Sequence, residues 1–156
     1  MVAYTDSLGF YKNSAGFTAN YTDRTSVLEI DIDFRKIAAA RTAAGDTALA
    51  ATDTLVIGTL PKGSYVVAAA LTLVRAEGAS ATIDVGVSGS TTLFAANFDL
   101  NAAVGTTVGV TNGARYQTAD TDILMTIDTN STDVARVKIA LAIINMGADL
   151  GVVPSA

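Results

Sequence analysis

Apolar and polar residues alternate along most of this chain, which is the pattern of β-strands that bury one face and expose the other. The clearest example covers residues 27–34, where apolar side chains alternate with Glu29, Asp31 and Asp33. The same alternation, or a short apolar run bounded by turn residues, recurs through the rest of the sequence. It predicts further strands at residues 54–60, 65–74, 82–87, 93–100, 104–110, 122–128 and 136–144.

One segment departs from this pattern. Residues 35–44 are rich in alanine, contain Ile37 and are followed by Gly45. Glycine is the residue that most often ends a helix, because it adopts the left-handed conformation without strain. We therefore expect one short helix between Arg35 and Ala44.

Two turns have specific signatures. Pro61-Lys62-Gly63 predicts a chain reversal of type I, in which proline presets the turn and glycine completes it. Asn112-Gly113 is the strongest hairpin signal in the chain, because a type I′ turn needs positive φ at both central residues.

About eight strands, closely spaced turns and no alternating helices predict an all-β fold. We expect an antiparallel β-sandwich, jelly-roll-like, with one short helix and an extended N-terminal arm. A chain of 156 residues suits one core better than two. The expected parts are an arm at residues 1–25, the sandwich at 26–146 and a C-terminal tail at 147–156.

The expected arm carries half of the chain's aromatic side chains and has no clear periodicity. Aromatic residues in a segment without its own core must be buried elsewhere, on the same domain, on a second subunit or on a partner. An arm folded back on its own sheet is the alternative to an arm that reaches a partner. The candidate partner-binding residues are Tyr4, Phe10, Tyr11, Phe17 and Tyr21.

Two of the predicted strands are apolar on both faces. In residues 65–74 and in the last strand, the face turned away from the core is still made of small or apolar side chains. Such a face suits close packing between subunits, so we expect a homo-oligomer, most simply a trimer. The candidate interface residues are Val66, Ala68, Ala70, Val74, Ala140, Ala142 and Ile144.

The composition removes most routes to catalysis. The chain has no histidine, cysteine or tryptophan, so the usual proton shuttle, thiolate nucleophile and imidazole metal ligand are missing. We therefore expect no enzyme activity and no cofactor. A net charge of −5 disfavours nucleic acid as a partner, and the apolar runs are too short for a membrane span. The first residues do not resemble a secretory signal, so synthesis in the cytoplasm is expected.

Three sets of acidic residues could still carry chemistry. Asp31 and Asp33 share a strand face at roughly 7 Å, the kind of pair that a glycosidase uses, although a solvated strand face is the simpler interpretation. Asp128, Asn130 and Thr132 have the spacing of the first residues of an EF-hand loop. The glycine and the closing glutamate that such a loop requires are absent here. A calcium site of another type could use Asp120, Asp122 and Asp128.

The order of these pieces resembles a known family. Five segments follow one another in the same order as in that family. They are the acidic alternating strand at residues 27–34, the Ala-rich segment at 37–44, the segments at 60–67 and 81–86, and a final strand with the sequence Val-Lys-Ile-Ala-Leu. This order, over residues 26–146, is similar to the decoration or cement proteins of tailed-bacteriophage capsids.

The resemblance implies a compact β-sandwich outside the capsid shell, commonly a trimer, which clamps neighbouring major capsid subunits together. It implies the major capsid protein and sister subunits as partners, the outer capsid surface as location, and no catalytic residues. A glycan- or receptor-binding sandwich of a head fibre or tail is the alternative. The scarcity of aromatic residues in the predicted loops, where sugars would stack, argues against that alternative.

Overall fold

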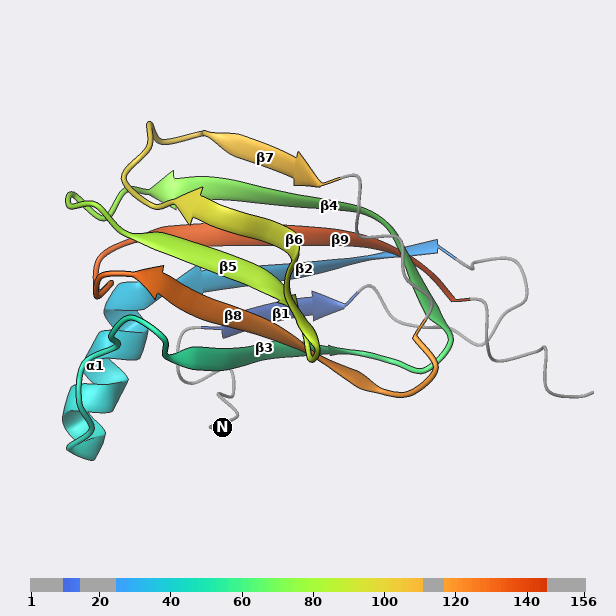
Figure 1. The fold of residues 1–156 in the computed structure, drawn as a ribbon, viewed down its shortest axis with the longest axis horizontal. Helices are drawn as coiled ribbons and strands as arrows, with labels where there is room; N and C mark the ends of the chain where they lie inside the picture. The colour runs from blue at the N-terminus through green and yellow to red at the C-terminus, as the bar shows by residue number, and fades with distance from the viewer. Residues whose placement is uncertain (1–9, 15–24, 111–116, 146–156) are drawn as a thin grey trace, which may run out of the picture.

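The computed structural model of this chain describes residues 10–14, 25–110 and 117–145, which form nine strands and one helix in two layers (Figure 1). The elements are β1 (Phe10–Ser14), β2 (Thr25–Asp33), α1 (Phe34–Ala44), β3 (Thr54–Leu60), β4 (Ser64–Arg75), β5 (Thr82–Val87), β6 (Ser90–Asp99), β7 (Thr107–Val110), β8 (Thr121–Thr129) and β9 (Arg136–Asn145).

The strands form two sheets, in the orders β1-β2-β9-β4-β7 and β3-β8-β5-β6. All the strand pairs are antiparallel. Among the described strands, β2 pairs with β9, β3 with β8, β4 with β7 and β5 with β6, so the pairs are nested around the β5–β6 hairpin. This is the jelly-roll-like antiparallel sandwich that the alternation predicts.

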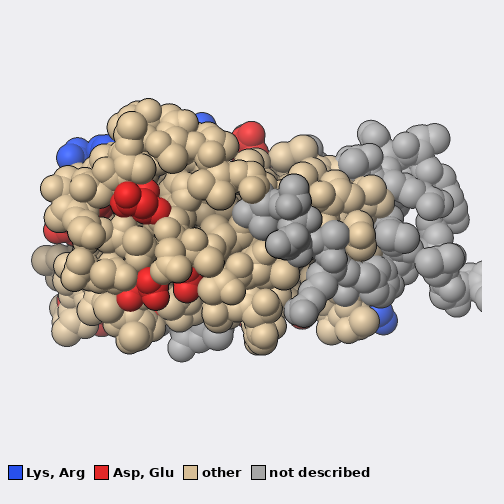
Figure 2. Space-filling model, turned by 45° about the horizontal axis from the view of Figure 1, so that its top comes forward, with Lys and Arg blue, Asp and Glu red and all other residues tan. Residues whose placement is uncertain are grey.

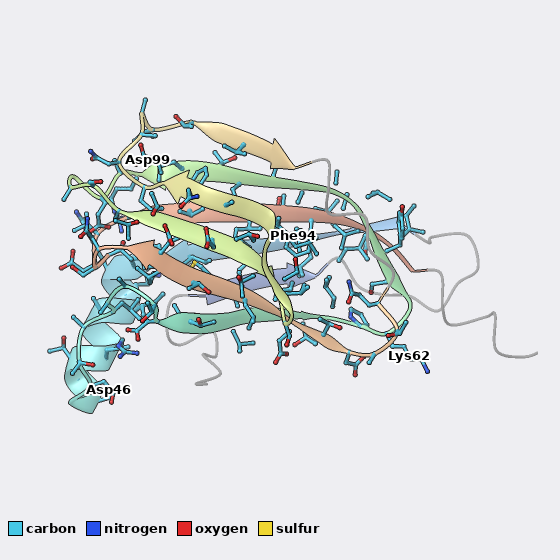
Figure 3. All side chains as sticks on the ribbon, in the orientation of Figure 1. Asp46, Lys62, Phe94 and Asp99 are labelled. Atoms are coloured by element: carbon cyan, nitrogen blue, oxygen red, sulfur yellow. The ribbon has the colours of Figure 1, made fainter. Side chains whose placement is uncertain are left out.

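A single apolar core lies between the two sheets. In β9, for example, Val137, Ile139, Leu141 and Ile143 are buried and the residues between them are not, which explains why the two-residue alternation in the sequence predicts the layers. Among the core residues Ile32, Leu71, Ile83, Phe94 and Ile139 are almost completely buried; Figure 3 labels Phe94. Each such side chain contributes about 1.5–3 kcal/mol by leaving water.

The helix α1 follows β2 directly and is capped at both ends. The side chain of Asp33 accepts a hydrogen bond from the Arg35 backbone N–H, and Gly45 ends the helix at φ 77°. Only Phe34 and Ile37 of the helix are buried, so its first turn joins the core and its remainder extends away from the sheets (Figure 1). The predicted helix and its glycine end are confirmed.

The inward and outward alternation of β4 changes phase near its start. Its register with β9 shifts between Val66 and Ala68, which is a β-bulge. Before the bulge Val66 points inward and is 0% exposed, whereas after it Ala69 and Leu71 point inward. The prediction that Val66 lies in an outer interface is therefore wrong. The bulge inserts one extra residue into β4, so even-numbered side chains point inward before it and odd-numbered side chains point inward after it.

The turn at Pro61-Lys62-Gly63 reverses the chain as predicted, but it is not type I. The Ser64 N–H donates to the Pro61 carbonyl at 3.1 Å, which makes Gly63 the third residue of the turn. Gly63 has φ 84°, and positive φ at this position is the mark of type II. The predicted Asn112-Gly113 hairpin turn lies outside the described residues.

The expected arm contributes a strand to the sandwich. Residues 10–14 form β1, which pairs with β2 from Phe10 opposite Ile32 to Ser14 opposite Leu28. Residues 1–9 precede β1 in the sequence, and residues 15–24 follow it. Within the described part of the chain, no helix is long and apolar enough to cross a membrane.

Candidate functional site

The outer faces of the two sheets differ in charge. The strands β3, β8, β5 and β6 contain Asp84, Asp99, Asp122 and Asp128 but no lysine or arginine. In Figure 2, acidic groups lie among uncharged ones, and basic groups lie only at the margins of the view. Acidic side chains of this kind keep the outer face of a sheet solvated.

The outer face formed by β2, β9 and β4 is small and apolar at the end away from α1, and it carries the charged Asp31, Lys138 and Arg136 at the end near α1. Its strand register places Val27, Ala142 and Ala68 in one row, and Glu29, Ala140 and Ala70 in the next. We call these rows the alanine face. Val27 is 47% exposed, and Ala68 is exposed as well. A depression of about 490 Å³ lies between the alanine face and the charged end of the sheet. Its lining combines Ala70, Thr72 and Ala140 with the charged Glu29, Asp31, Arg136 and Lys138.

Most of the predicted interface residues lie on this outer side. Ala70, Ala140 and Ala142 are half-buried on the alanine face, and Val74 and Ile144 are half-buried near the ends of β4 and β9. The nearby Val67, in the β4 bulge, is 40% exposed and belongs to the same surface, although its position in the sequence suggested the core. The bulge thus replaces Val66 with Val67 on the outer side.

Two ion pairs border the alanine face near α1. Arg136 binds Asp31 through two nitrogens, at 2.8 and 2.5 Å, and Arg75 binds Asp33 at 2.5 Å. The hydrogen bond from Arg136 holds the pKa of Asp31 below its ordinary value of 3.8, against the opposing effect of burial. Each carboxylate of the candidate glycosidase pair is thus held by an arginine of its own.

The Arg136–Asp31 pair should make stability depend on pH. Because the pKa of Asp31 is lowered on folding, its contribution is present above 3.8 and is lost as pH falls through the folded pKa. We expect Arg136→Met to lower the free energy of unfolding by about 1 kcal/mol at pH 7. Thermal denaturation should show this difference shrinking toward pH 3, and Lys62→Met, at an exposed turn, should change little at either pH. An Arg136→Met deficit that persists unchanged at pH 3 would assign the effect to packing.

A carboxylate that sequence reasoning missed lies at the same end of the sandwich. Glu77, in the connection from β4 to β5, accepts a hydrogen bond from the Thr132 hydroxyl at 2.6 Å and from the Ala135 N–H at 2.7 Å. It also accepts from the N–H groups of Asp133 and Val134. Nothing in the sequence near Glu77 signals this role, because its partners are more than fifty residues away in the chain.

The pKa values of Glu77 and Asp133 shift in opposite directions. Burial raises the pKa of Glu77, but the hydrogen bonds from residues 132–135 outweigh burial and bring it below 4.5. A hydrogen bond between the two side chains, and the negative charge of Glu77, raise the pKa of Asp133 above 3.8.

The residues considered for calcium are not brought together. The Asp120 carboxylate accepts from the Lys62 backbone N–H, and that of Asp128 accepts from the Thr82 hydroxyl. Asp122 accepts from Thr59 on β3. Among the residues that the structure describes, no three histidine, cysteine, aspartate or glutamate side chains are grouped to hold a metal ion.

The candidate arm residues fall into two groups. Phe10 and Tyr11 belong to β1, the edge strand beside β2. Tyr4, Phe17 and Tyr21 lie outside the described residues. Tyr4 precedes β1, whereas Phe17 and Tyr21 follow it, so the five aromatic residues do not form one continuous segment.

Comparison with known proteins gives a likeness of fold. No sequence family and no curated protein matches the chain. A chain of the capsid of Ralstonia phage GP4 superposes with a TM-score of 0.58 and 18% identity, over 83% of this chain and 89% of that one. A chain of the cyanophage Pam1 capsid asymmetric unit gives 0.60 and 16%, over 83% and 91%.

A third similar chain comes from the acidic stable capsid structure of Helicobacter pylori bacteriophage KHP30. Its TM-score is 0.53 at 11% identity, over 86% of this chain and 93% of that one. At such low identities the comparisons establish a shared fold. Since they cover nearly the whole length of each capsid chain, what this protein shares with them is the complete sandwich.

Proposed function

We propose that this protein is a virion structural protein that binds the outer surface of a phage capsid and stabilises it by bridging major capsid subunits. The observation that carries the proposal is the likeness to three chains of phage capsids over 89 to 93% of their lengths. The proposal assigns no catalytic residue and no cofactor to the chain.

The lengths of the matched chains favour an accessory role. The matches cover 83 to 86% of this chain and a larger share of each capsid chain, so those chains are of similar length or slightly shorter. The likeness is therefore between whole small proteins, and not between this protein and one domain of a much larger one. A small separate sandwich fits a component that is added to a shell.

The alanine face supports an oligomer, most simply a trimer. A symmetric oligomer would contact several shell subunits at once, and weak single contacts would then gain avidity through effective concentration. The contrast between the alanine face and the acidic outer face of the other sheet favours the alanine face as the side that contacts a sister subunit.

We expect Ala142→Asp to dissociate the oligomer, because it places a charge in the middle of the alanine face, beside Val27 and Ala68. Light scattering at micromolar concentration would measure the mass. Ala96→Asp, the same change at an exposed alanine of β6, should leave the mass unchanged. A monomeric wild-type protein, or a fully assembled Ala142→Asp variant, would contradict this interface.

Shell binding should depend on the aromatic residues near the N-terminus. Burial of each aromatic side chain would contribute on the order of 1.5–3 kcal/mol, enough to decide whether the protein remains on a particle. Removing residues 1–9 preserves β1, whereas removing residues 1–25 also deletes β1 and leaves the β2 edge unpaired. The informative variants are therefore a deletion of residues 1–9 and the double substitution Phe17→Ala, Tyr21→Ala.

Co-sedimentation with undecorated shells, followed by heating, would measure binding and stabilisation. We expect the wild-type protein to sediment with the shells and raise their disruption temperature, and at least one of the two variants to remain in the supernatant. Unchanged binding by both variants would remove these aromatic residues from the mechanism. If the wild-type protein does not bind shells, the proposed function fails and the glycan- or receptor-binding alternative gains support.

A further inference from the structure

The outer face of β2, β9 and β4 carries one positive and one negative side chain that have no charged partner. Asp31 lies directly opposite Lys138 in the strand register, but both oxygens of the Asp31 carboxylate accept hydrogen bonds from Arg136. The two ion pairs within the described part of the chain are those of Asp31 and Asp33. Neither the Lys138 ammonium group nor the Glu29 carboxylate takes part in one, and each remains available to a partner.

These two charges lie at the depression on the outer face. Glu29 of β2 is opposite Ala140 of β9, and Lys138 precedes Ala140 by two residues, so the three side chains share one face. Glu29 and Lys138 are exposed, and both line the depression together with Ala70 and Ala140. The short alanine side chains leave room for a partner to approach between the two charges.

An ion pair within one copy is the alternative use of these charges. Glu29 and Lys138 are diagonal neighbours on adjacent strands, a spacing that long side chains can bridge. In the structure the two groups do not form this pair. A test of any contact between copies must therefore distinguish it from a pair within one copy.

The partner that fits this surface best is the same surface of a second copy. The fit requires small apolar side chains at one end and both signs of charge at the other. The apolar end exposes Val27 by 47% and Val67 by 40%, which suits the core of an interface, and the charged end suits its polar rim. The strands of the other sheet contain aspartates but no lysine or arginine, so their outer face could match only one of the two charges.

We propose that Glu29 of one copy forms an ion pair with Lys138 of a neighbouring copy, and that this pair sets how the alanine faces meet. The inference deepens the oligomer described under the proposed function and rests on it. In any closed symmetric ring of copies, each Glu29 meets one Lys138 and all of these charges are paired. Opposite charges favour this arrangement, and like charges disfavour shifted ones.

Charge reversal tests the pair, with light scattering to measure the mass. Glu29→Lys and Lys138→Glu each place like charges in every contact, so each should raise the dissociation constant of the oligomer on the order of 100-fold. The double variant Glu29→Lys, Lys138→Glu restores opposite charges and should assemble as the wild type does. Lys62→Glu, at an exposed turn, should leave the mass unchanged.

Mixed assembly distinguishes a contact between copies from a pair within one copy. The double variant and the wild type present like charges to each other, whichever copy supplies residue 29. Tagged wild-type protein co-expressed with the untagged double variant should therefore capture little of it, whereas it should capture untagged wild-type protein readily. Free mixing of the double variant with the wild type would place the pair within one copy and overturn the proposal.

The remaining outcomes separate this inference from the proposed function. If both single variants remain fully assembled while Ala142→Asp dissociates, the alanine face is an interface but the ion pair is not made, and the inference fails alone. A monomeric wild-type protein would also overturn it. The proposed function is measured separately by co-sedimentation with shells, so a protein that assembles through this pair and does not bind shells would refute only that function.

Discussion

Gly86→Ala is expected to destabilise the sandwich by about 3 kcal/mol, which lowers Tm by roughly 6–12 °C in a domain of this size. Gly86 lies in β5, where the turn into β6 crosses close to it. A Cβ at this position would lie 2.1 Å from the Ser90 carbonyl oxygen and 2.5 Å from that of Thr91. Both are backbone atoms, so no flexible side chain can move aside and the hairpin itself must shift.

The matched control is Gly109→Ala in β7. A Cβ on Gly109 would meet nothing within 4 Å, and its backbone is not in the left-handed region. Both substitutions therefore reduce the conformational entropy of the unfolded chain by the same amount. They differ in that only the Cβ at position 86 clashes with the backbone. Urea or thermal denaturation would measure both. Equal stabilities would show that the β5–β6 turn can move without loss.

Glu77→Ala should have the second-largest effect, on the order of 3 kcal/mol at pH 7. The substitution removes the acceptor for three backbone N–H groups and the Thr132 hydroxyl, and Thr132 is almost completely buried. Hydrogen bonds to a charged group contribute about 1.5–3 kcal/mol each, and a buried donor left without a partner adds a cost, although water can reach part of this connection.

Urea denaturation and amide exchange would together test this expectation. Exchange should accelerate most at residues 133–135 and at Phe34, whose N–H donates to Ala135. Asp46→Ala, at an exposed position just after α1, should change stability by less than about 0.5 kcal/mol. Fast exchange confined to residues 133–135, with no loss of global stability, would restrict the role of Glu77 to its own connection.

The strands and the helix could be predicted because their signals are local. Alternation along residues 27–34 and the glycine at position 45 each reflect the geometry of a single element. The phase change in β4 could not be predicted this way. Whether Val66 or Val67 faces the core depends on a bulge that β4 makes only when it pairs with β9, which lies far along the chain.

The contacts of the polar residues also could not be predicted, because they depend on which distant strands become neighbours. The acidic pattern of β2 was visible, but the arginines that bind Asp31 and Asp33 come from β9 and β4. Glu77 has no neighbour in sequence that reveals its contacts. The alanine face was predicted in large part, because small residues at alternate positions of two strands are visible before the strands are known to be neighbours.

The nested pairing of the strands constrains how the chain can fold. Within the nested set, β5 and β6 are the pair closest in sequence, and each pair outside them encloses a longer stretch of chain, up to β2 with β9. Closing a longer loop costs more entropy and is slower, so pairing should proceed outward from the β5–β6 hairpin. During synthesis, β2 cannot pair with β9 until β9 has left the ribosome. Until then the open β2 edge could pair with another chain, and rapid coverage of this edge would favour soluble expression.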